Sequence, residues 1–299
     1  MPTLELLRRK IETATDLQSV VTTMKTLAAV SIHQYERAAD ALAAYHRTIE
    51  MGLQIVLRDG AWRRLPACDR QNVPAGSSRY GVIVFGSDQG MCGQFNEQIA
   101  RYAIDRHAAS SDRRPSATCV IGSRVVSSLT DAGWTIDESF RIPTSVPEIA
   151  DGVSNWLLAI ERLRETRQLT TLRVFSNIRS AARSYQSHSR QLLPINPKWL
   201  SDLRHREWDS RSLPTFAGDR QQLMALLIRQ SLYVSLYQAC AESLASENAS
   251  RIAAMQAAEK NIEETLDELD LSFKTQRQTA ITEEILDVVI GFEALMSQQ

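Results

Sequence analysis

The stretch "SENASRIAAMQAAEKNIEETLDELDLSFKTQRQTAITEEILDVVIGFEAL", residues 246–295, contains one glycine and no proline. It overlaps a longer span, from Asp219 to Ile290, that has neither residue, and a second such span lies between Pro2 and Gly52. At about 1.5 Å per residue, the C-terminal span would form a straight helix on the order of 100 Å long, which is far longer than an ordinary globular helix. The sequence therefore predicts two long helices that form a coiled coil or a helical stalk.

The apolar spacing in both spans supports helix pairing. The N-terminal span has a heptad seam that continues after a shift, as a stutter would produce, through Leu4, Leu7, Ile11, Ala14, Leu17, Val21, Met24 and Ala28. The C-terminal span keeps steps of three and four through Leu266, Leu269, Phe273, Ile281, Ile285 and Val288. A row of small side chains, which would let another helix approach closely, runs through Ala241, Ala245, Ala249, Ala253 and Ala257. Core helices of an ordinary bundle are the alternative. We favour pairing because the two helices lie at opposite ends of the chain.

The middle of the chain alternates strand-like and helix-like segments. Strands are predicted over 79–88, from 117, from 170 and from 185, and helices over 94–108, 123–132 and 146–167. Such alternation is typical of an α/β sheet with crossover helices. Residues 58–78, which contain two prolines and two glycines, are interpreted as a connector.

Composition and charge narrow the class of protein. The chain has 299 residues, of which 43% are hydrophobic, so it can bury one or two cores. No apolar run approaches the length of a membrane span, and the start "MPTLELLRRK" lacks the uncharged core of a signal peptide, which favours the cytoplasm or a cytoplasmic membrane face. The net charge of -1 combines a net charge of +6 over residues 52–218 with one of -7 over residues 219–299. This difference indicates segments with different surroundings.

The loop "VIVFGSDQGMCGQFN", residues 82–96, suggests a nucleotide-binding turn. However, Gly86, Gly90 and Gly93 match neither the dinucleotide nor the phosphate-loop spacing, and no lysine follows them. Glycines after a strand also let a chain turn sharply into a helix, and Asp88 can cap backbone donors without any ligand. A phosphate site is therefore the less favoured interpretation of this loop.

Other catalytic or metal-binding patterns are weaker. The four cysteines, Cys68, Cys92, Cys119 and Cys240, form no Cys-x-x-Cys pair and are interpreted as reduced thiols. The five histidines form no His-x3-His pair, and there is no Gly-x-Ser-x-Gly elbow. The arginine-rich region 173–211 could contact nucleic acid but carries no recognisable binding motif. We accordingly predict no catalytic residue, no metal, no cofactor and no nucleic-acid partner.

Three motifs give the chain a resemblance to the gamma subunit of F-type ATP synthases. The C-terminal run is similar to the family's C-terminal signature, with matches at Ser246, Glu247, Arg251, Ala254, Met255, Ala258, Asn261, Arg277, Gln278, Ala280, Ile281, Thr282, Glu283, Glu284, Ile285, Gly291, Ala294 and Leu295. "SDQGMCGQFN", residues 87–96, resembles the other signature. "LLRRKIETATDLQSVVTTMKTLAA", residues 6–29, keeps a basic cluster and the Met24–Lys25 pair.

The resemblance implies a non-catalytic rotor shaft. The terminal helices would form a long antiparallel coiled coil inside a ring of alpha and beta subunits, with a Rossmann-like α/β foot domain that touches the epsilon subunit and the c-ring. The implied division is an N-terminal helix (1–57), the connector (58–78), the foot domain (79–213) and a C-terminal helix (214–299). The glycine loop would bind no nucleotide. The chain would lie at the cytoplasmic face of the cell membrane as a peripheral protein, with membrane contact only through the c-ring.

Roles for individual residues also follow from the resemblance. Rotor–stator contacts are implied for Met24, Lys25, Arg277, Gln278, Thr282 and Glu283, and the stretch 288–295 would lie in the bearing of the ring. Structural motif residues would be Ser87, Asp88, Gly90, Cys92, Gly93, Phe95, Asn96, Arg251 and Met255. The chain departs from the family at "SIHQYERA", residues 31–38, where a basic stretch is usual, and at Lys274, where asparagine is usual. A coiled-coil scaffold with an α/β domain and a nucleotide-dependent enzyme are the alternatives.

Overall fold

The computed structural model describes residues 3–58, 79–109, 114–180, 184–208, 211–212 and 214–296. Within this range the chain forms two compact units. One contains residues 1–28 and 252–299, which we call the helix-pair unit, and the other contains residues 29–251, which we call the α/β unit. The connector expected at 58–78 lies, apart from its first residue, outside the described residues.

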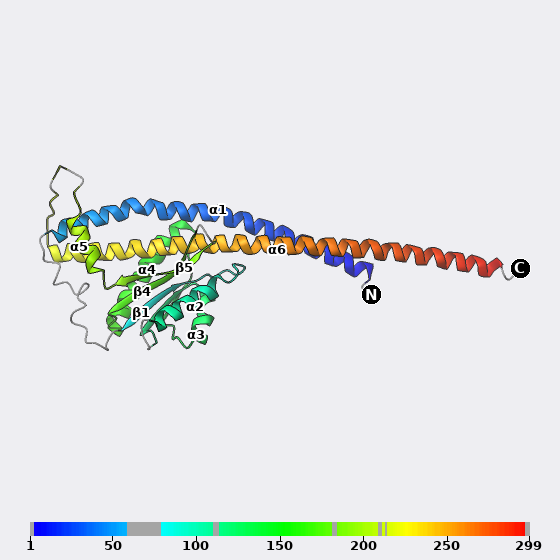
Figure 1. The fold of residues 1–299 in the computed structure, drawn as a ribbon, viewed down its shortest axis with the longest axis horizontal. Helices are drawn as coiled ribbons and strands as arrows, with labels where there is room; N and C mark the ends of the chain where they lie inside the picture. Colours follow the sequence, from blue (N-terminus) through cyan, green and yellow to red (C-terminus); the bar gives the residue numbers. More distant parts are fainter. Residues whose placement is uncertain are drawn as a thin grey trace. The chain divides into compact units, whose positions relative to one another are not determined.

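Two long helices, at the two ends of the chain, contribute to both units. Helix α1 covers Leu4–Leu57 and α6 covers Arg220–Met296, and they run side by side in opposite directions (Figure 1). In the α/β unit Leu227 packs against Gly52, and Gln230 hydrogen-bonds Tyr45, as expected for antiparallel helices. The prediction of a long antiparallel pair of terminal helices is confirmed.

The seam of the helix-pair unit is more regular than the sequence suggested. On α1 a row of less exposed positions follows steps of three and four without interruption, through Leu4, Leu7, Ile11, Ala14, Gln18, Val21, Lys25 and Ala28, and Met24 beside this row is also partly buried. The stutter predicted at Leu17 is wrong, since that side chain is 52% exposed. Polar Gln18 and Lys25 take the seam positions where the sequence analysis looked for apolar residues. The seam of α6 has the same spacing, through Ile252, Met255, Glu259, Ile262, Leu266, Leu269, Phe273 and Gln276.

Two further expectations for α6 are only partly met. Ala241 and Ala245 are buried, but Ala253 and Ala257 are exposed, because steps of four drift around a helix of 3.6 residues per turn. Leu266, Leu269 and Phe273 lie on the seam, whereas Ile281, Ile285 and Val288 do not: every residue from 277 to 290 is exposed.

The α/β unit is built on a five-stranded sheet in the order β3-β2-β1-β4-β5. The strands are β1 (Tyr80–Phe85), β2 (Ala117–Ile121), β3 (Glu138–Phe140), β4 (Thr171–Ile178) and β5 (Gln186–Leu193). The pairs β1–β2, β1–β4 and β2–β3 are parallel, and β4–β5 is antiparallel. The mixed α/β class is confirmed. The three-residue β3 was not predicted.

Helices cover both faces of this sheet (Figure 1). The connecting helices are α2 (Phe95–Ala108), the 3₁₀ turn η2 (Ser123–Val125) with α3 (Val126–Asp131), α4 (Val146–Arg167) and α5 (Pro197–His205). Residues of α2 and α3 pack on one face, with Val82, Val84 and Phe175. Residues of α1, α4 and α6 pack on the other face, against Ile83, Phe85 and Val174. Helix α5, which was not predicted, packs with the end of α1 and the beginning of α6.

Helix α6 is enclosed in this unit. Residues 243–248 are all buried, including the polar Ser243, Ser246, Glu247 and Asn248. A helix with one solvent-facing stripe would not bury six consecutive residues, so α6 is a central element here. Over the described residues, no helix has the length and apolar character needed to cross a membrane.

Candidate functional site

The glycine loop follows β1, and Gly86 at its start allows close backbone packing. The Gly86 N–H donates to the Ile121 carbonyl at 2.7 Å, which joins the ends of β1 and β2. A β-carbon on Gly86 would lie 2.7 Å from Val125. Gly122 has φ +103°, and a β-carbon there would lie 2.7 Å from Gly86 C and Ser87 N. Only glycine fits such a close approach between two turns.

The carboxylate of Asp88 fills the donors at this end of the sheet. It accepts hydrogen bonds from Ser123 N and Ser123 Oγ, both at 2.7 Å, and from Ile142 N at 2.8 Å. Burial by itself would raise the pKa of Asp88, but these donors, with some help from Arg141, hold it below its ordinary value. An anionic side chain of the protein thus occupies the backbone N–H groups of Ser123 and Ile142 at this end of the sheet.

A buried polar cluster fixes the rest of the loop. Asn96 Oδ1 accepts from Ser87 N at 2.9 Å, and Asn96 Nδ2 donates to Ser87 Oγ at 2.8 Å. Cys92 Sγ lies 3.6 Å from Ser87 Oγ, and burial raises the pKa of its thiol. Phe95 is fully buried, with its ring 5.3 Å from that of Tyr185. The cluster therefore acts as an internal brace.

The loop is joined directly to α6. Ser250 Oγ donates to the Cys92 carbonyl at 2.7 Å, across 158 residues of sequence. Arg251, the next residue of α6, pairs with Glu247 one turn earlier. Its Nη2 atom lies 2.6 Å from Glu247 Oε1, and only 7% and 5% of the Arg251 and Glu247 side chains are exposed. Arg251 also donates to Asn248 Oδ1 at 3.1 Å. We call Glu247, Asn248, Ser250 and Arg251, together with Cys92, the α6 joint.

The ion pair in the α6 joint is incompletely satisfied. Burial raises the pKa of Glu247, although Arg251 acts in the opposite direction. Glu247 Oε2 and Arg251 Nε find no hydrogen-bond partner within the described part of the chain. Both charges are therefore held away from water, and each depends on the other.

The structure brings together most of the predicted motif residues. Eight of the nine lie in the α/β unit, in or beside the glycine loop and the α6 joint: Ser87, Asp88, Gly90, Cys92, Gly93, Phe95, Asn96 and Arg251. The ninth, Met255, is buried in the helix-pair unit. Their roles as structural residues stay predictions.

The predicted rotor–stator residues lie in the helix-pair unit. Lys25 Nζ donates to Glu259 Oε2 at 2.5 Å across the seam, and this bond lowers the pKa of Glu259. Arg277, Gln278, Thr282 and Glu283 are all exposed on α6. The Thr282 hydroxyl donates to the Gln278 carbonyl at 2.9 Å, and Arg277 forms no ion pair with any described residue.

Some site residues were missed in the sequence analysis. Glu247 and Ser250 were not proposed as site residues, although Glu247 and Arg251 have the i, i+4 spacing of a helical ion pair. Glu259 was missed as the partner of Lys25, and the signal was a charged residue at a seam position in each helix. Three arginines of the region 173–211, which was considered for nucleic-acid binding, have partners within the chain. Arg179 forms an ion pair with Glu36 and Arg206 one with Glu50, and Arg190 donates a hydrogen bond to Gln238.

Comparison with known proteins agrees with this architecture. The family model described as ATP synthase matches residues 3–295. The chain therefore belongs to the ATP synthase family. Its relatives include the ATP synthase gamma chains of Allorhizobium ampelinum, 26% identical over 99% of this chain and 100% of the relative, and of Sinorhizobium fredii, 27% identical with the same coverage. The resemblance drawn from the three motifs is confirmed.

A solved structure shares the fold. The match is to a chain of the Euglena gracilis mitochondrial ATP synthase, described as OSCP/F1/c-ring in rotational state 3. It has a TM-score of 0.62 and 17% identity, and covers 98% of this chain and 94% of that one.

Proposed function

We propose that the chain is the non-catalytic central shaft of a rotary ATP synthase, which couples ion flow through a membrane c-ring to ATP synthesis or hydrolysis on an alpha/beta ring. The observation that carries the proposal is the helix-pair unit. It joins the two ends of the chain along a regular seam, and α6 then continues alone through an exposed stretch rich in apolar side chains. Such a stretch needs a partner, and the curated relatives are gamma chains.

The proposal assigns the remaining parts by family likeness. The α/β unit would serve as the foot that meets the epsilon subunit and the c-ring, and the chain would be peripheral at the cytoplasmic membrane face. Its domain division would be 1–57, 58–78, 79–213 and 214–299. The rotating shaft would present different faces to the three catalytic subunits and so bias each toward a different affinity state.

The proposal includes the absence of catalysis. The backbone donors of Ser123, after β2, and Ile142, after β3, are taken by Asp88, and the loop is tied to α6 through Cys92. A nucleotide-dependent enzyme would need a free phosphate site there. Tight binding of labelled ATP to the isolated chain would favour the enzyme over the shaft.

The first test is copurification. A tagged chain expressed with its native partners should bring down alpha and beta subunits in a stoichiometric complex that hydrolyses ATP. A coiled-coil scaffold unrelated to ATP synthases would purify without them, and that result would overturn the proposal.

The second test addresses the exposed polar groups of α6. Replacing both Arg277→Ala and Gln278→Ala should weaken ATP-driven ion pumping by the assembled complex, because both groups are free to hydrogen-bond neighbouring loops in the ring. The isolated variant should unfold at the same temperature as the native chain, since both side chains are exposed. Normal ATP-driven pumping by the double variant would remove these two residues from the rotor–stator contacts.

A further inference from the structure

Strand β5 forms a long edge of the sheet. It is the last strand in the sheet order, and within the described residues no strand pairs with its outer side. It has eight residues, whereas β3 at the opposite edge has three. In an antiparallel pair, alternate residues point their N–H and C=O groups away from the partner strand. The outer side of β5 therefore presents a row of backbone donors and acceptors.

This edge lacks the usual protection against pairing. Natural edge strands are commonly blocked by lysine, proline, bulges or very short length. No lysine or proline occurs in β5, and its one arginine, Arg190, donates to Gln238 of α6 at 3.2 Å. The register with β4 is regular from Gln186 to Gln191, and the only irregularity among these pairs lies beyond, at Leu172/Arg173. Six consecutive residues thus form a regular edge without lysine, proline or a bulge.

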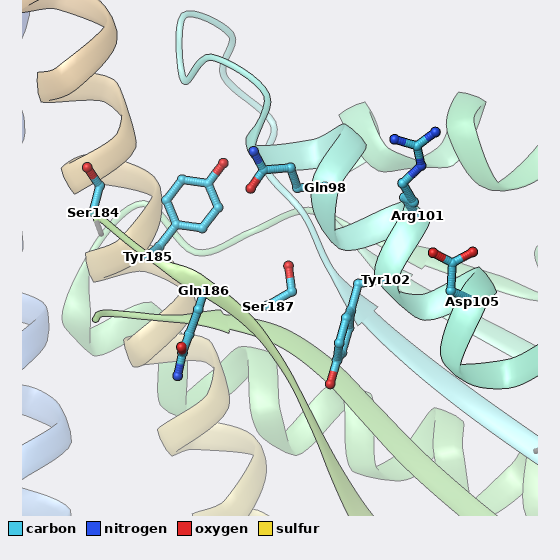
Figure 2. A pocket seen from close by; sticks show the side chains of 8 residues that line it. All are labelled: Gln98, Arg101, Tyr102, Asp105, Ser184, Tyr185, Gln186 and Ser187. Atoms are coloured by element: carbon cyan, nitrogen blue, oxygen red, sulfur yellow. The ribbon is translucent and has the colours of Figure 1, made fainter. Parts of the chain in front are cut away.

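A hollow lined by polar residues lies beside the start of this edge. It has a volume of about 500 Å³ and is lined by the outer face of α2 and by residues 184–187 (Figure 2). Gln98, Arg101 and Tyr102 contribute from α2, and Ser184, Tyr185 and Ser187 from the strand side. Hydroxyl and amide groups of this kind donate hydrogen bonds to a carboxylate.

Three arginines and two acidic residues lie in or near the lining of the hollow. Arg101 is exposed and makes no ion pair with any described residue, and the guanidinium of Arg106 lies 5.7 Å from the centre of the Tyr102 ring. Burial by itself would raise the pKa of Tyr102, but hydrogen bonds from Ser189 and Arg106 and the charges of Arg106 and Arg173 lower it. The acidic side chains in the same region are those of Asp105, in the lining, and Glu97, near Tyr185.

We propose that β5 is the docking edge for an extended, acidic segment of another polypeptide, which adds a strand to the sheet and places a carboxylate side chain in the hollow beside Arg101. Strand addition draws its affinity from main-chain hydrogen bonds and its specificity from side-chain pockets next to the edge. Both elements are present here, and the arginines select an acidic partner. A second copy of this chain is the competing occupant, and the test separates the two.

The first experiment measures amide hydrogen exchange of residues 186–191 in the isolated chain and in the purified native complex. Half of these amides are already bonded to β4 and exchange slowly in both samples. The other half should exchange at least about tenfold more slowly in the complex, because each gains a strand partner. Equal exchange of the outward amides in the two samples would overturn the proposal.

The second experiment tests the charge and identifies the partner. Arg101→Glu should abolish the added protection of β5, whereas Arg162→Glu, on α4 at the opposite face, should leave it unchanged. A photoreactive residue in place of Gln186 should crosslink to an acidic, non-helical segment of another subunit. A crosslink to a helix or to a second copy of this chain, or protection that survives Arg101→Glu, would refute the inference.

These outcomes are separate from those of the proposed function. If the chain fails to copurify with alpha and beta subunits, the shaft proposal fails. If it does copurify and the outward β5 amides remain unprotected, only the docking edge is lost. The unfolding midpoint of the isolated Arg101→Glu chain checks that it is folded, and an unchanged midpoint is expected because Arg101 is exposed.

Discussion

Residues 243–248 and 277–290 belong to the same helix, and their surroundings differ completely. The first stretch is buried at every position, with four polar side chains among the six. The second is exposed at every position, yet it contains Ile281, Ile285, Leu286, Val288, Val289 and Ile290, each at least 47% exposed. In α6, burial follows from the partners available within the chain and not from local hydrophobicity. The exposed stretch is the part that needs a partner from outside.

Intrinsic helix preference points the same way. Five of the exposed apolar residues in 281–290 are β-branched, and such residues lose side-chain freedom in a helix. Isolated helical segments are marginal without tertiary packing. The buried stretch has tertiary packing within the chain, whereas the exposed stretch would obtain it only in a complex.

The largest expected effect lies in the α6 joint. Arg251→Met should reduce the free energy of unfolding by roughly 3–5 kcal/mol, because it leaves the Glu247 carboxylate buried without its partner. Urea or thermal unfolding of the isolated chain measures this. The double variant Arg251→Met with Glu247→Gln should recover most of the loss, and a double variant as unstable as the single one would contradict the explanation.

The difference in stability between the single and the double variant should depend on pH. Burial raises the pKa of Glu247 in the folded state, so the folded state holds its proton to a higher pH than the unfolded state. The stability associated with that proton is fully present below the unfolded pKa and is lost as the pH rises through the folded pKa. The gap between the single and the double variant should therefore widen from acid toward neutral pH.

Replacing a leucine by alanine in each of the two stretches tests the comparison directly. Leu244→Ala should cost about 2–5 kcal/mol, because Leu244 is 3% exposed in the main core and its truncation leaves a cavity. Leu286→Ala, at a leucine that is 53% exposed, should change stability by less than about 0.5 kcal/mol in the isolated chain. Similar losses for both variants would show that residues near 286 are packed within the isolated chain.

A smaller effect is expected at the hydrogen bond between α6 and the glycine loop. Ser250→Ala should cost about 1–3 kcal/mol, because it leaves the Cys92 carbonyl without its donor in a buried setting. Thr265→Ala is the matched control, since its hydroxyl bonds only the Asn261 carbonyl of its own exposed helix turn. Chemical denaturation of both variants gives the comparison, and equal midpoints would mean that the loop is held by other contacts.

The smallest expected effect lies on the seam. Lys25→Met should raise the pKa of Glu259 toward its ordinary value near 4.5, because the hydrogen bond from Lys25 is the main cause of the lowered pKa. A lowered carboxyl pKa contributes stability above the unfolded pKa, and this contribution is lost as the pH falls through the folded pKa. The variant should therefore lose less stability than the native chain on acidification. An NMR titration of the Glu259 carboxyl carbon checks the shift, and an unchanged pKa would contradict it.

The main elements of the fold could be predicted from the sequence because their signals are local. The two long helices follow from spans without glycine or proline, and the strands β1, β2 and β4 follow from β-branched runs. Strand β3 was missed because Glu138–Phe140 has no such run and is a strand only by pairing with β2. Helix α5 was missed because its nine residues, beginning at Pro197, are too few to establish a period.

The site was less predictable because its contacts are not local. No rule of spacing connects Ser250 with Cys92, and the motif residues could be assigned to one place only through the family resemblance. The seam was misjudged at Leu17 for a different reason. Polar Gln18 and Lys25 occupy seam positions, and apolar periodicity alone does not register them.

The uninterrupted spacing of the seam has a mechanical consequence. A repeat of 3.5 residues lags an ideal helix by about 20° per heptad, and helices that keep such a repeat coil around each other in the left-handed sense. The spacing on α1 keeps this repeat from Leu4 to Ala28. A left-handed two-stranded coil tightens when its ends are twisted in one sense and loosens when they are twisted in the opposite sense. The helix pair should thus be torsionally stiffer in one direction of rotation than in the reverse direction.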